Sequence, residues 1–352
     1  MMNKIKTSPK LADTKAIIKY IKKIDTNRYY SNFGPLYQYT VKKISRDYDF
    51  KKNSVILTSS GHSSLFACFL YLKTITKKKY VLVPSFNFYS SPHAIIQSGF
   101  EPYFIDINKD NYSLNHERIQ KAFYKLKNNV AGIVAVSPFG YPLNIENLNL
   151  IQKKFNTRVI YDAADTFINF NKKIDNSKIL ICCSFHPTKT LPANESGMIL
   201  CQNNIFKILK SIISFGVSGK NKEVLFSGFN GKFSEYDAAI FLANYNHKTE
   251  IKKKLFKKIE YFTNKFNNLN KQNISMLEGF GNTWVSTKIC FISKKGPVGN
   301  LQKKFNKFRV EIYSAWNKKT LHKHSFFKHY KSFNLKNTSF ISKKFFIIPI
   351  NL

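Results

Sequence analysis

Acidic residues are scarce in this chain of 352 residues, which has 20 Asp and Glu but 57 Lys and Arg and a formal net charge of +37. Such an excess of positive charge is typical of proteins that bind nucleic acid or anionic membranes. Here, however, the lysines are spread along the whole chain in short groups, such as 77–79 and 252–254. Together with the many Asn, Ile and Phe residues, this pattern is typical of AT-rich codon usage. The positive net charge still produces an electrostatic potential over the whole molecule, which attracts anionic substrates.

Long apolar runs are also missing. No stretch approaches the roughly 18 apolar residues of a membrane-spanning helix, and residues 1–15 are basic and polar, unlike a signal peptide. The five cysteines show no metal-ligand spacing, and Cys182 and Cys183 lie in an apolar run where free thiols behave as small core residues. We therefore expect a cytoplasmic protein with reduced cysteines, no metal and no membrane span.

Nucleic-acid-binding motifs are absent as well. The sequence has no helix-turn-helix signature, zinc-finger spacing or RNA-binding aromatic motif, and residues 1–31 are too few for an added winged-helix domain. We expect no specific nucleic-acid partner. The 43% hydrophobic content, with 33 Phe and 19 Tyr, is ample for a packed core and argues against disorder.

Short apolar runs alternate with amphipathic segments from residue 54 to about residue 201. The pattern predicts strands at 54–57, 80–84, 102–106, 132–137, 158–162, 179–184 and 197–201, and helices at 65–72, 89–97, 117–127 and 145–155. This alternation favours a three-layer α/β/α sandwich with a mainly parallel sheet. In such a fold the loops after the strand ends form the ligand site.

The chain changes character after this region. Residues 215–231 contain four glycines and no periodicity, which predicts a mobile loop. Ser234 can then cap a helix, and Asp237, three residues later, is in the position that completes a capping box. One long lysine-rich helix is expected from there to about residue 268.

Two domains follow from this organisation. We expect residues 1–240 to form a large domain, with an N-terminal arm at 1–30. Residues 241–352 are expected to form a smaller C-terminal α/β domain.

Lys189 and Asp162 form the most informative pair in the sequence, because each lies at or just after the end of an apolar run. A lysine at the edge of a sheet with a carboxylate nearby is what pyridoxal 5'-phosphate (PLP) chemistry needs. The amine forms a Schiff base with the cofactor aldehyde, and the carboxylate keeps the pyridine nitrogen protonated.

Two further segments fit the same chemistry. The run 59–64 lies between a strand and a helix, where backbone N–H groups and hydroxyls can hold a phosphate. The run 84–88 follows the next strand and supplies an aromatic ring that can stack on a flat group. Taken singly, each also has a structural explanation, as a helix cap or a core aromatic.

The order of these motifs resembles the DegT/DnrJ/StrS family of sugar aminotransferases. The segments that carry the resemblance are 59–64 (Ser-Gly turn), 84–88 (Pro-Ser-Phe-x-Phe), 162–165 (Asp-Ala-Ala), 184–189 (Ser-Phe-His-x-x-Lys) and 228–235 (Gly-Phe-Asn-x-Lys-x-Ser-Glu). It runs from about 32–35 to 346–350, and also includes 99–106 and 139–142. The resemblance implies a PLP-dependent enzyme of fold type I.

The resemblance also implies roles for individual residues. Lys189 matches the Schiff-base lysine that also moves the substrate proton, and Asp162 matches the partner of the pyridine nitrogen. The other implied cofactor contacts are Gly61, His62, Ser63 and Ser184 at the phosphate, Phe88 over the ring, Asp165 beside it, and Asn230. Since the family donates Asn230 from the neighbouring subunit, a homodimer with shared active sites is implied. Substrate-side residues implied by position are His186, Lys232, Tyr313 and His322.

The sequence departs from the family pattern at several of these positions. His62 and Ser63 replace the usual Thr-Ala pair, and Asp165 stands where relatives carry Gln or His facing the cofactor's phenolic oxygen. A second carboxylate there would repel the phenolate unless it is protonated or turned away. The interface loop has Asn230-Gly231-Lys232 in place of Asn-Tyr-Arg.

The implied reaction is transfer of an amino group, with glutamate as donor, to a nucleotide-linked keto sugar in amino-sugar or surface-glycan biosynthesis. Two alternatives stay open: a PLP enzyme acting on a non-sugar substrate, and a catalytically silent regulatory relative. Lys189 argues against the sugar dehydratases of the family, which carry histidine there.

Overall fold

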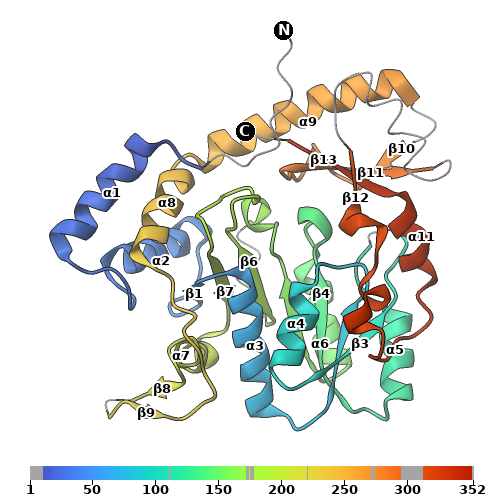
Figure 1. Ribbon diagram of the computed structural model, residues 1–352, viewed down its shortest axis with the longest axis horizontal. Helices are drawn as coiled ribbons and strands as arrows, with labels where there is room; N and C mark the ends of the chain where they lie inside the picture. Colours follow the sequence, from blue (N-terminus) through green and yellow to red (C-terminus); the bar gives the residue numbers. More distant parts are fainter. Residues whose placement is uncertain are drawn as a thin grey trace.

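The structure of the protein, a computed structural model, has a large α/β part and a smaller antiparallel sheet at one end (Figure 1). It describes residues 11–110, 112–171, 174, 178–219, 221–270, 274–294 and 312–350.

Seven strands of the described residues form the central sheet, in the order β1-β7-β6-β5-β4-β2-β3. Their bounds are β1 Val55–Thr58, β2 Tyr80–Pro84, β3 Glu101–Ile105, β4 Val130–Val136, β5 Arg158–Asp162, β6 Leu180–Ser184 and β7 Gly197–Leu200. The strands are parallel except β7, which runs antiparallel to both of its neighbours. Each predicted strand is confirmed to within a few residues.

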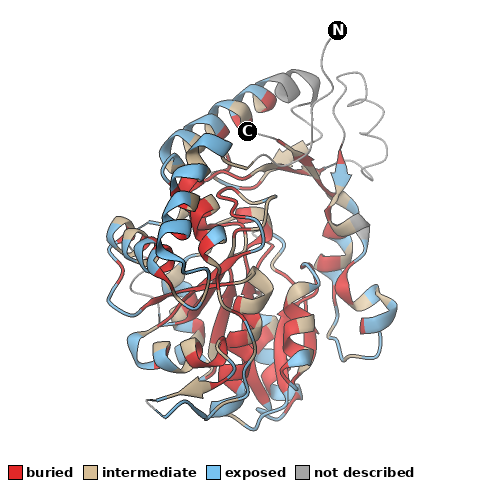
Figure 2. Ribbon diagram, turned by 60° about the vertical axis from the view of Figure 1, so that its left-hand side comes forward, coloured by how far each residue is buried: buried red, intermediate tan, exposed pale blue. Residues whose placement is uncertain are grey.

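Helices cover both faces of the sheet, and the side chains of each strand alternate between two hydrophobic clusters. In β5, Val159 and Tyr161 pack in one cluster while Ile160 packs in the other. The first cluster lies under α2 (Pro35–Tyr48), α5 (His116–Lys125), α6 (Ile145–Lys154) and α8 (Glu235–Tyr245); the second lies under α3 (Gly61–Ile75), α4 (Ser90–Gln97) and α7 (Asn203–Ile212). The predicted three-layer sandwich is therefore confirmed, with its core at the sheet (Figure 2).

The region after the sheet follows the expectations in part. Within 215–231 the chain forms a short hairpin of β8 (Val217–Ser218) and β9 (Glu223–Val224). The predicted cap is confirmed, because the N–H of Asp237 donates to Oγ of Ser234 at 3.0 Å. The single long helix is wrong: α8 ends at Tyr245 and α9 (Lys248–Asn270) runs in another direction. The break separates a helix buried on nearly every side from one that lies on the surface.

The C-terminal part is built on an antiparallel sheet of order β10-β11-β13-β12, comprising β10 (Ile274–Met276), β11 (Lys288–Ser293), β13 (Phe345–Pro349) and β12 (Tyr313–Ser314), with α11 (Lys336–Lys344) beside it. It contacts the large part directly, since the N–H of Leu321 donates to the carbonyl of Ser85 at 3.1 Å. The smaller α/β part is thus confirmed. The boundary at residue 240 stays a prediction, because α8 spans it.

The N-terminal arm contains α1 (Thr14–Asn27), which packs against α8. All five cysteines are buried, as expected for core residues, and none forms a disulfide; Sγ of Cys68 lies 3.5 Å from Sγ of Cys182. In the part of the chain that the structure describes, we find no helix with the length and apolar character needed to cross a membrane.

Candidate active site

The carboxyl end of the central sheet brings several of the predicted residues together. Asp162 and Ser184 are the last residues of β5 and β6, and Gly61 begins α3 just after β1. Lys189 lies in the turn after β6, with its Nζ 3.7 Å from Oδ2 of Asp165. The strand ends therefore converge on one site, as parallel topology requires.

Asp162 is buried and held by a helix on one face of the sheet. Oγ of Ser91 in α4 donates to its Oδ2 at 2.6 Å, and the N–H of Ala164 donates to Oδ1 at 3.3 Å. Nδ2 of Asn87 in turn donates to Oγ of Ser91 at 3.0 Å. Burial raises the pKa of Asp162, while Ser91 and the nearby Lys189 favour the carboxylate. The arrangement suits a carboxylate that must hold a proton on a partner nitrogen.

Lys189 is held by a tight turn, in which its N–H donates to the carbonyl of His186 at 2.8 Å. Its side chain is only 22% exposed. Burial lowers the pKa of the amine, and the carboxylates of Asp165 and Asp162 act in the opposite direction. A buried amine of this kind is more readily available in its neutral, nucleophilic form.

Asp165 faces two amines. Nζ of Lys288, at the start of β11, lies 2.9 Å from its Oδ2, closer than Lys189. Burial tends to raise the pKa of Asp165, but the two ammonium groups outweigh it and hold the pKa below its usual value. The carboxylate is therefore charged and paired, rather than protonated.

The turn before α3 carries a cluster of hydroxyl groups. Oγ of Ser60 caps the helix by accepting from the N–H of Ser63 at 2.9 Å, and Oγ of Ser63 also lies 2.8 Å from Oγ of Ser59. At Gly61 a Cβ would lie 2.6 Å from Cβ of Ser184, so only glycine allows the turn and β6 to approach this closely. The cluster is thus a compact group of donors at a helix start.

His62 lies in this turn, but its side chain points to α4. Its Nδ1 lies 2.9 Å from Oγ of Ser90, and its Nε2 lies 2.9 Å from Oε1 of Gln97. A phosphate contact at His62 would therefore come from its backbone.

The two aromatics after β2 have different surroundings. Phe86 is buried against Trp316 and Phe345, with ring centroids 4.6 and 5.4 Å away. Phe88 is 45% exposed and lies against Tyr89. Of these two rings, the one of Phe88 is exposed and the one of Phe86 is enclosed.

The expected substrate residues lie on different elements of the fold. Nε2 of His186 is 3.3 Å from Glu195, and Nδ1 of His322 is 2.7 Å from Oγ of Ser85 at the end of β2. Burial lowers the pKa of His322. Tyr313 lies on the edge strand β12 of the small sheet and is 41% exposed.

Asn230 and Lys232 lie at the edge of the central sheet, outside the cluster around Lys189. Lys232 forms a bridge with Thr58 of the edge strand β1, and its Nζ donates to Oδ1 of Asn230 at 2.7 Å.

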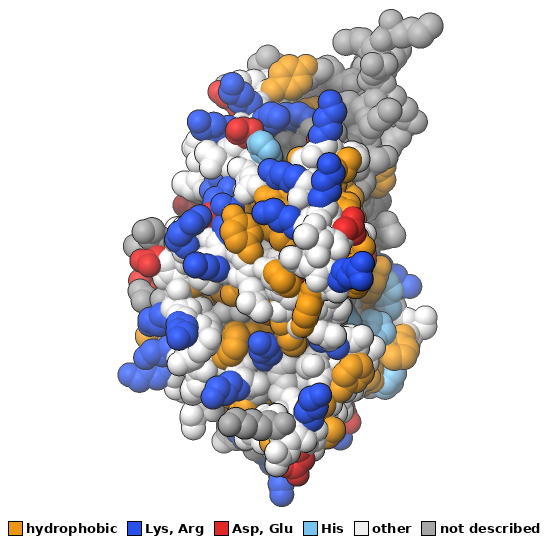
Figure 3. Space-filling model, turned by 90° about the vertical axis from the view of Figure 1, so that its left-hand side faces the viewer, with side chains coloured by type: hydrophobic (Ala, Val, Ile, Leu, Met, Phe, Trp, Pro, Cys, Tyr) orange, Lys and Arg blue, Asp and Glu red, His pale blue; other side chains and the backbone are white. Residues whose placement is uncertain are grey.

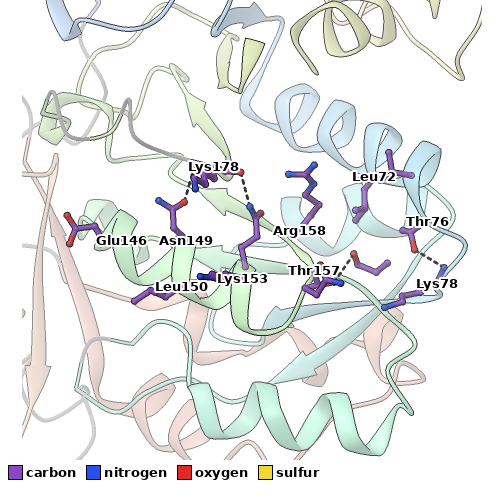
Figure 4. Close-up of a pocket in the computed structure, with 14 residues that line it drawn as sticks. Leu72, Thr76, Lys78, Glu146, Asn149, Leu150, Lys153, Thr157, Arg158 and Lys178 are labelled. Carbon is purple, nitrogen blue, oxygen red and sulfur yellow. Dashed lines mark hydrogen bonds between the residues drawn. The ribbon is translucent and has the colours of Figure 1, made fainter. Parts of the chain in front are cut away.

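A separate pocket of about 850 Å³ opens at the opposite end of the sheet (Figure 4). It is lined by Leu72 of α3, by residues of α6 and by Arg158, the first residue of β5. Asp162 is the last residue of that strand, so the pocket is separated from the candidate site by the length of β5.

Ser91 and Lys288 are the site residues that sequence reasoning missed. Ser91 had one usable signal, since its hydroxyl lies in the first turn of a helix that begins at the ligand edge. Lys288 had none, because it is one of 57 basic residues and belongs to the other part of the chain.

Comparisons with known proteins show which proteins this chain is similar to. The profile of the DegT/DnrJ/EryC1/StrS aminotransferase family matches residues 12–352. The dTDP-4-amino-4,6-dideoxy-D-glucose transaminase of Shigella dysenteriae is 27% identical over 248 residues, which are 68% of this chain and 64% of that protein. The matched region therefore spans less than two thirds of that relative. The 3-oxo-glucose-6-phosphate:glutamate aminotransferase of Bacillus subtilis is 27% identical over 54% of this chain and 43% of its own length.

Solved structures share the whole fold. A Bacillus cereus protein described as a PLP-dependent aminotransferase superposes with a TM-score of 0.86 at 26% identity, covering 99% of this chain and 94% of that one. DesI, solved in the presence of its TDP-sugar product, superposes with a TM-score of 0.82 at 16% identity, covering 99% and 88%. At that identity the second similarity concerns the fold alone.

Proposed function

The chain belongs to the DegT/DnrJ/EryC1/StrS aminotransferase family, whose members are PLP-dependent, and on that premise we propose that it transfers an amino group to a nucleotide-linked keto sugar. The observation that carries the proposal is the placement of Lys189, whose Nζ lies 3.7 Å from the buried carboxylate of Asp165 and which also interacts electrostatically with Asp162, the last residue of β5. The names of the Shigella and Bacillus subtilis relatives support a sugar acceptor, and the second supports glutamate as donor.

The residues present fit PLP. Oδ1 of Asp165 is buried and has no hydrogen-bond partner among the described residues, so it can accept a bond from a bound group. The hydroxyls of Ser63 and Ser184 flank the helix start at Gly61, where a phosphate would bind. We propose these residues, with Asp162 and Phe88, as the cofactor contacts.

When bound, PLP supplies an aldehyde that links to an amine and a ring that takes up the electron pair of a broken C–H bond. Lys189 supplies that amine, and burial favours its neutral form. The same amine can then accept the proton from the substrate carbon and return it. Asp162, whose carboxylate accepts a hydrogen bond from Ser91, would hold a proton on the pyridine nitrogen.

The remaining roles concern substrate and assembly. We assign His186 and His322 to the substrate side of the site, with Tyr313 and Lys232 as outer contacts. Asn230 and Lys232 would complete the site of a second copy of this chain. Exposed apolar side chains on the side of the molecule where α1, α2, α8 and the β8–β9 hairpin lie (Figure 1) support a homodimer: Tyr29 and Tyr30, Tyr39, Phe215, Val224, Leu225 and Tyr236. Figure 3 shows that hydrophobic side chains lie among lysines on this face.

Covalent trapping tests the enzyme assignment. Borohydride reduction of the PLP-loaded protein should fix the cofactor mass on the peptide that contains Lys189. Lys189→Ala should lose this mass and reduce turnover on the order of 10³-fold or more, because one side chain supplies both nucleophile and base. Lys121→Ala is the matched control, since Lys121 also pairs with a carboxylate, that of Glu117, on an exposed helix.

A half-reaction assay tests the substrate. Glutamate should convert the loaded enzyme to its amino form, and one of a panel of nucleotide-linked keto sugars should restore the starting absorbance. Trapping at Lys189 without a response to any nucleotide sugar would favour a non-sugar substrate. Absence of trapping would contradict the enzyme assignment and favour a silent relative.

A further inference from the structure

Asp165 and Lys288 form an ion pair that joins the two sheets beside Lys189. The two side chains are largely buried, with exposures of 6% and 17%. Oδ2 of Asp165 lies 2.9 Å from Nζ of Lys288 and 3.7 Å from Nζ of Lys189. One carboxylate oxygen thus lies between two amines, and Lys288 is the nearer.

The position of Lys288 is set by contacts of its own segment. Thr287 donates through Oγ1 to the carbonyl of Thr188 at 2.8 Å, directly beside Lys189. The N–H of Lys288 donates to Oγ of Ser286 at 3.2 Å. The start of β11 therefore holds both the turn that carries Lys189 and the cation that faces Asp165.

The charged groups that act on Lys189 come from two places in the fold, the end of β5 with the turn after it and the start of β11. Asp165 follows β5, Asp162 ends β5, and Lys288 begins β11. Both carboxylates favour the ammonium form of Lys189, whereas Lys288 opposes it. Without Lys288, Asp165 would have Lys189 as its remaining cationic partner and would stabilise an ammonium group that cannot act as a nucleophile.

We propose that Lys288 is a positioning residue, which pairs with Asp165 and thereby keeps the amine of Lys189 available for covalent chemistry. The inference rests on the proposed function only in taking Lys189 as the nucleophile. The pair also carries no net charge, so the carboxylate of Asp165 does not present an uncompensated negative charge to an anionic group beside it.

Trace labelling of lysines measures directly how the ionisation of the Lys189 amine depends on pH. The full chain, freed of cofactor, is labelled with acetic anhydride between about pH 6 and pH 11, and mass spectrometry gives the labelling midpoint of Lys189. In Lys288→Met the midpoint should rise by about one pH unit or more, with roughly tenfold less labelling below it. Lys288→Arg should stay close to the wild type. Lys121→Met, which breaks an exposed ion pair, should change nothing at Lys189.

Asp165 completes a double-mutant cycle. Asp165→Asn should lower the midpoint, because the anion is lost and Lys288 remains. Asp165→Asn combined with Lys288→Met should return the midpoint towards the wild type, since the two effects oppose each other.

The inference is overturned if Lys288→Met leaves the midpoint unchanged or lowers it, or if the double variant keeps the full shift of Lys288→Met. Circular dichroism checks that each variant is folded. If Lys288→Met does not fold, the Asp165→Asn variant provides the test, and an unchanged or raised labelling midpoint of Lys189 in that variant overturns the inference. Labelling does not depend on PLP. Midpoints that follow the cycle in a protein that never traps PLP would therefore refute the proposed function and leave this inference standing.

Discussion

Asp162 is buried, and the hydroxyl of Ser91 is the strongest of the contacts that favour its carboxylate form. Its Oδ2 accepts from Ser91 at 2.6 Å, and burial otherwise raises its pKa. In the proposed reaction the carboxylate is the active form, so activity should fall as the pH drops through this pKa. The acid limb of the activity–pH profile therefore measures the effect of the hydrogen bond between Ser91 and Asp162.

Ser91→Ala should move that acid limb to higher pH. A hydrogen bond to a charged group contributes roughly 1.5–3 kcal/mol, which corresponds to about one to two pKa units. The measurement is kcat against pH for both proteins. Ser98→Ala is the matched control, because Ser98 lies at the end of the same helix and donates only to the carbonyl of Ala94. An acid limb that shifts equally in both variants would contradict the role of Ser91.

Helix α2 begins at a buried carboxylate from a distant part of the chain. The N–H groups of Leu36 and Tyr37 donate to Oε2 and Oε1 of Glu235 at 2.7 and 2.8 Å. A carboxylate at a helix N-terminus satisfies free donors and interacts favourably with the helix dipole. Glu235 also leaves little room beside Gly34, where a Cβ would approach it within 2.9 Å. It thus joins α8 to α2.

Glu235→Gln should destabilise the protein by about 2–3 kcal/mol, since it removes the charge and places an NH₂ group against an N–H donor. Urea unfolding followed by circular dichroism gives the loss. Glu250→Gln, on the exposed start of α9, should cost no more than about 0.5 kcal/mol. Equal losses in the two variants would show that Glu235 does not hold α2.

The proposed homodimer would form at the edge of the central sheet. Asn230 and Lys232 lie beside β1, the edge strand, and exposed aromatic side chains share this side. The excess of Lys and Arg is scattered over the same face, rather than gathered in one patch (Figure 3). The proposed homodimer with shared sites therefore predicts that two defective chains can complement each other.

Mixing Lys189→Ala chains with Asn230→Ala/Lys232→Ala chains should restore about one quarter of wild-type activity. With random pairing half the dimers are mixed, and each mixed dimer has one complete site. Differently tagged, co-expressed chains allow the measurement, with light scattering to confirm the dimer. Mixing Lys189→Ala with Asp162→Asn is the control and should restore nothing, because both residues belong to one chain's site. No gain over the parents in confirmed dimers would show that the sites are not shared.

The amino-acid sequence was sufficient to predict the sandwich fold and the residues that the structure brings together at the carboxyl end of the sheet. Strands that are buried on both faces consist of continuous runs of apolar residues. The amphipathic helices between them repeat their apolar residues about every 3.6 positions. Both patterns can therefore be recognised in the amino-acid sequence alone. Lys189, Asp162 and Ser184 follow such runs, and parallel strands bring their ends to a common edge. For the same reason the turn at Gly61 was recognisable.

The contacts that adjust this site were decided by tertiary packing. Lys288 and Asp165 are separated by 123 positions, and Ser91 and Asp162 by 71. The periodicity of a short stretch of sequence does not indicate a contact between residues so far apart along the chain. A single lysine among 57 basic residues also gives no indication of its partner. The charge of Asp165 therefore looked unfavourable in the sequence. Only the approach of β11 to the end of β5 supplies its partner, because an ion pair depends on distance in space and not on position along the chain.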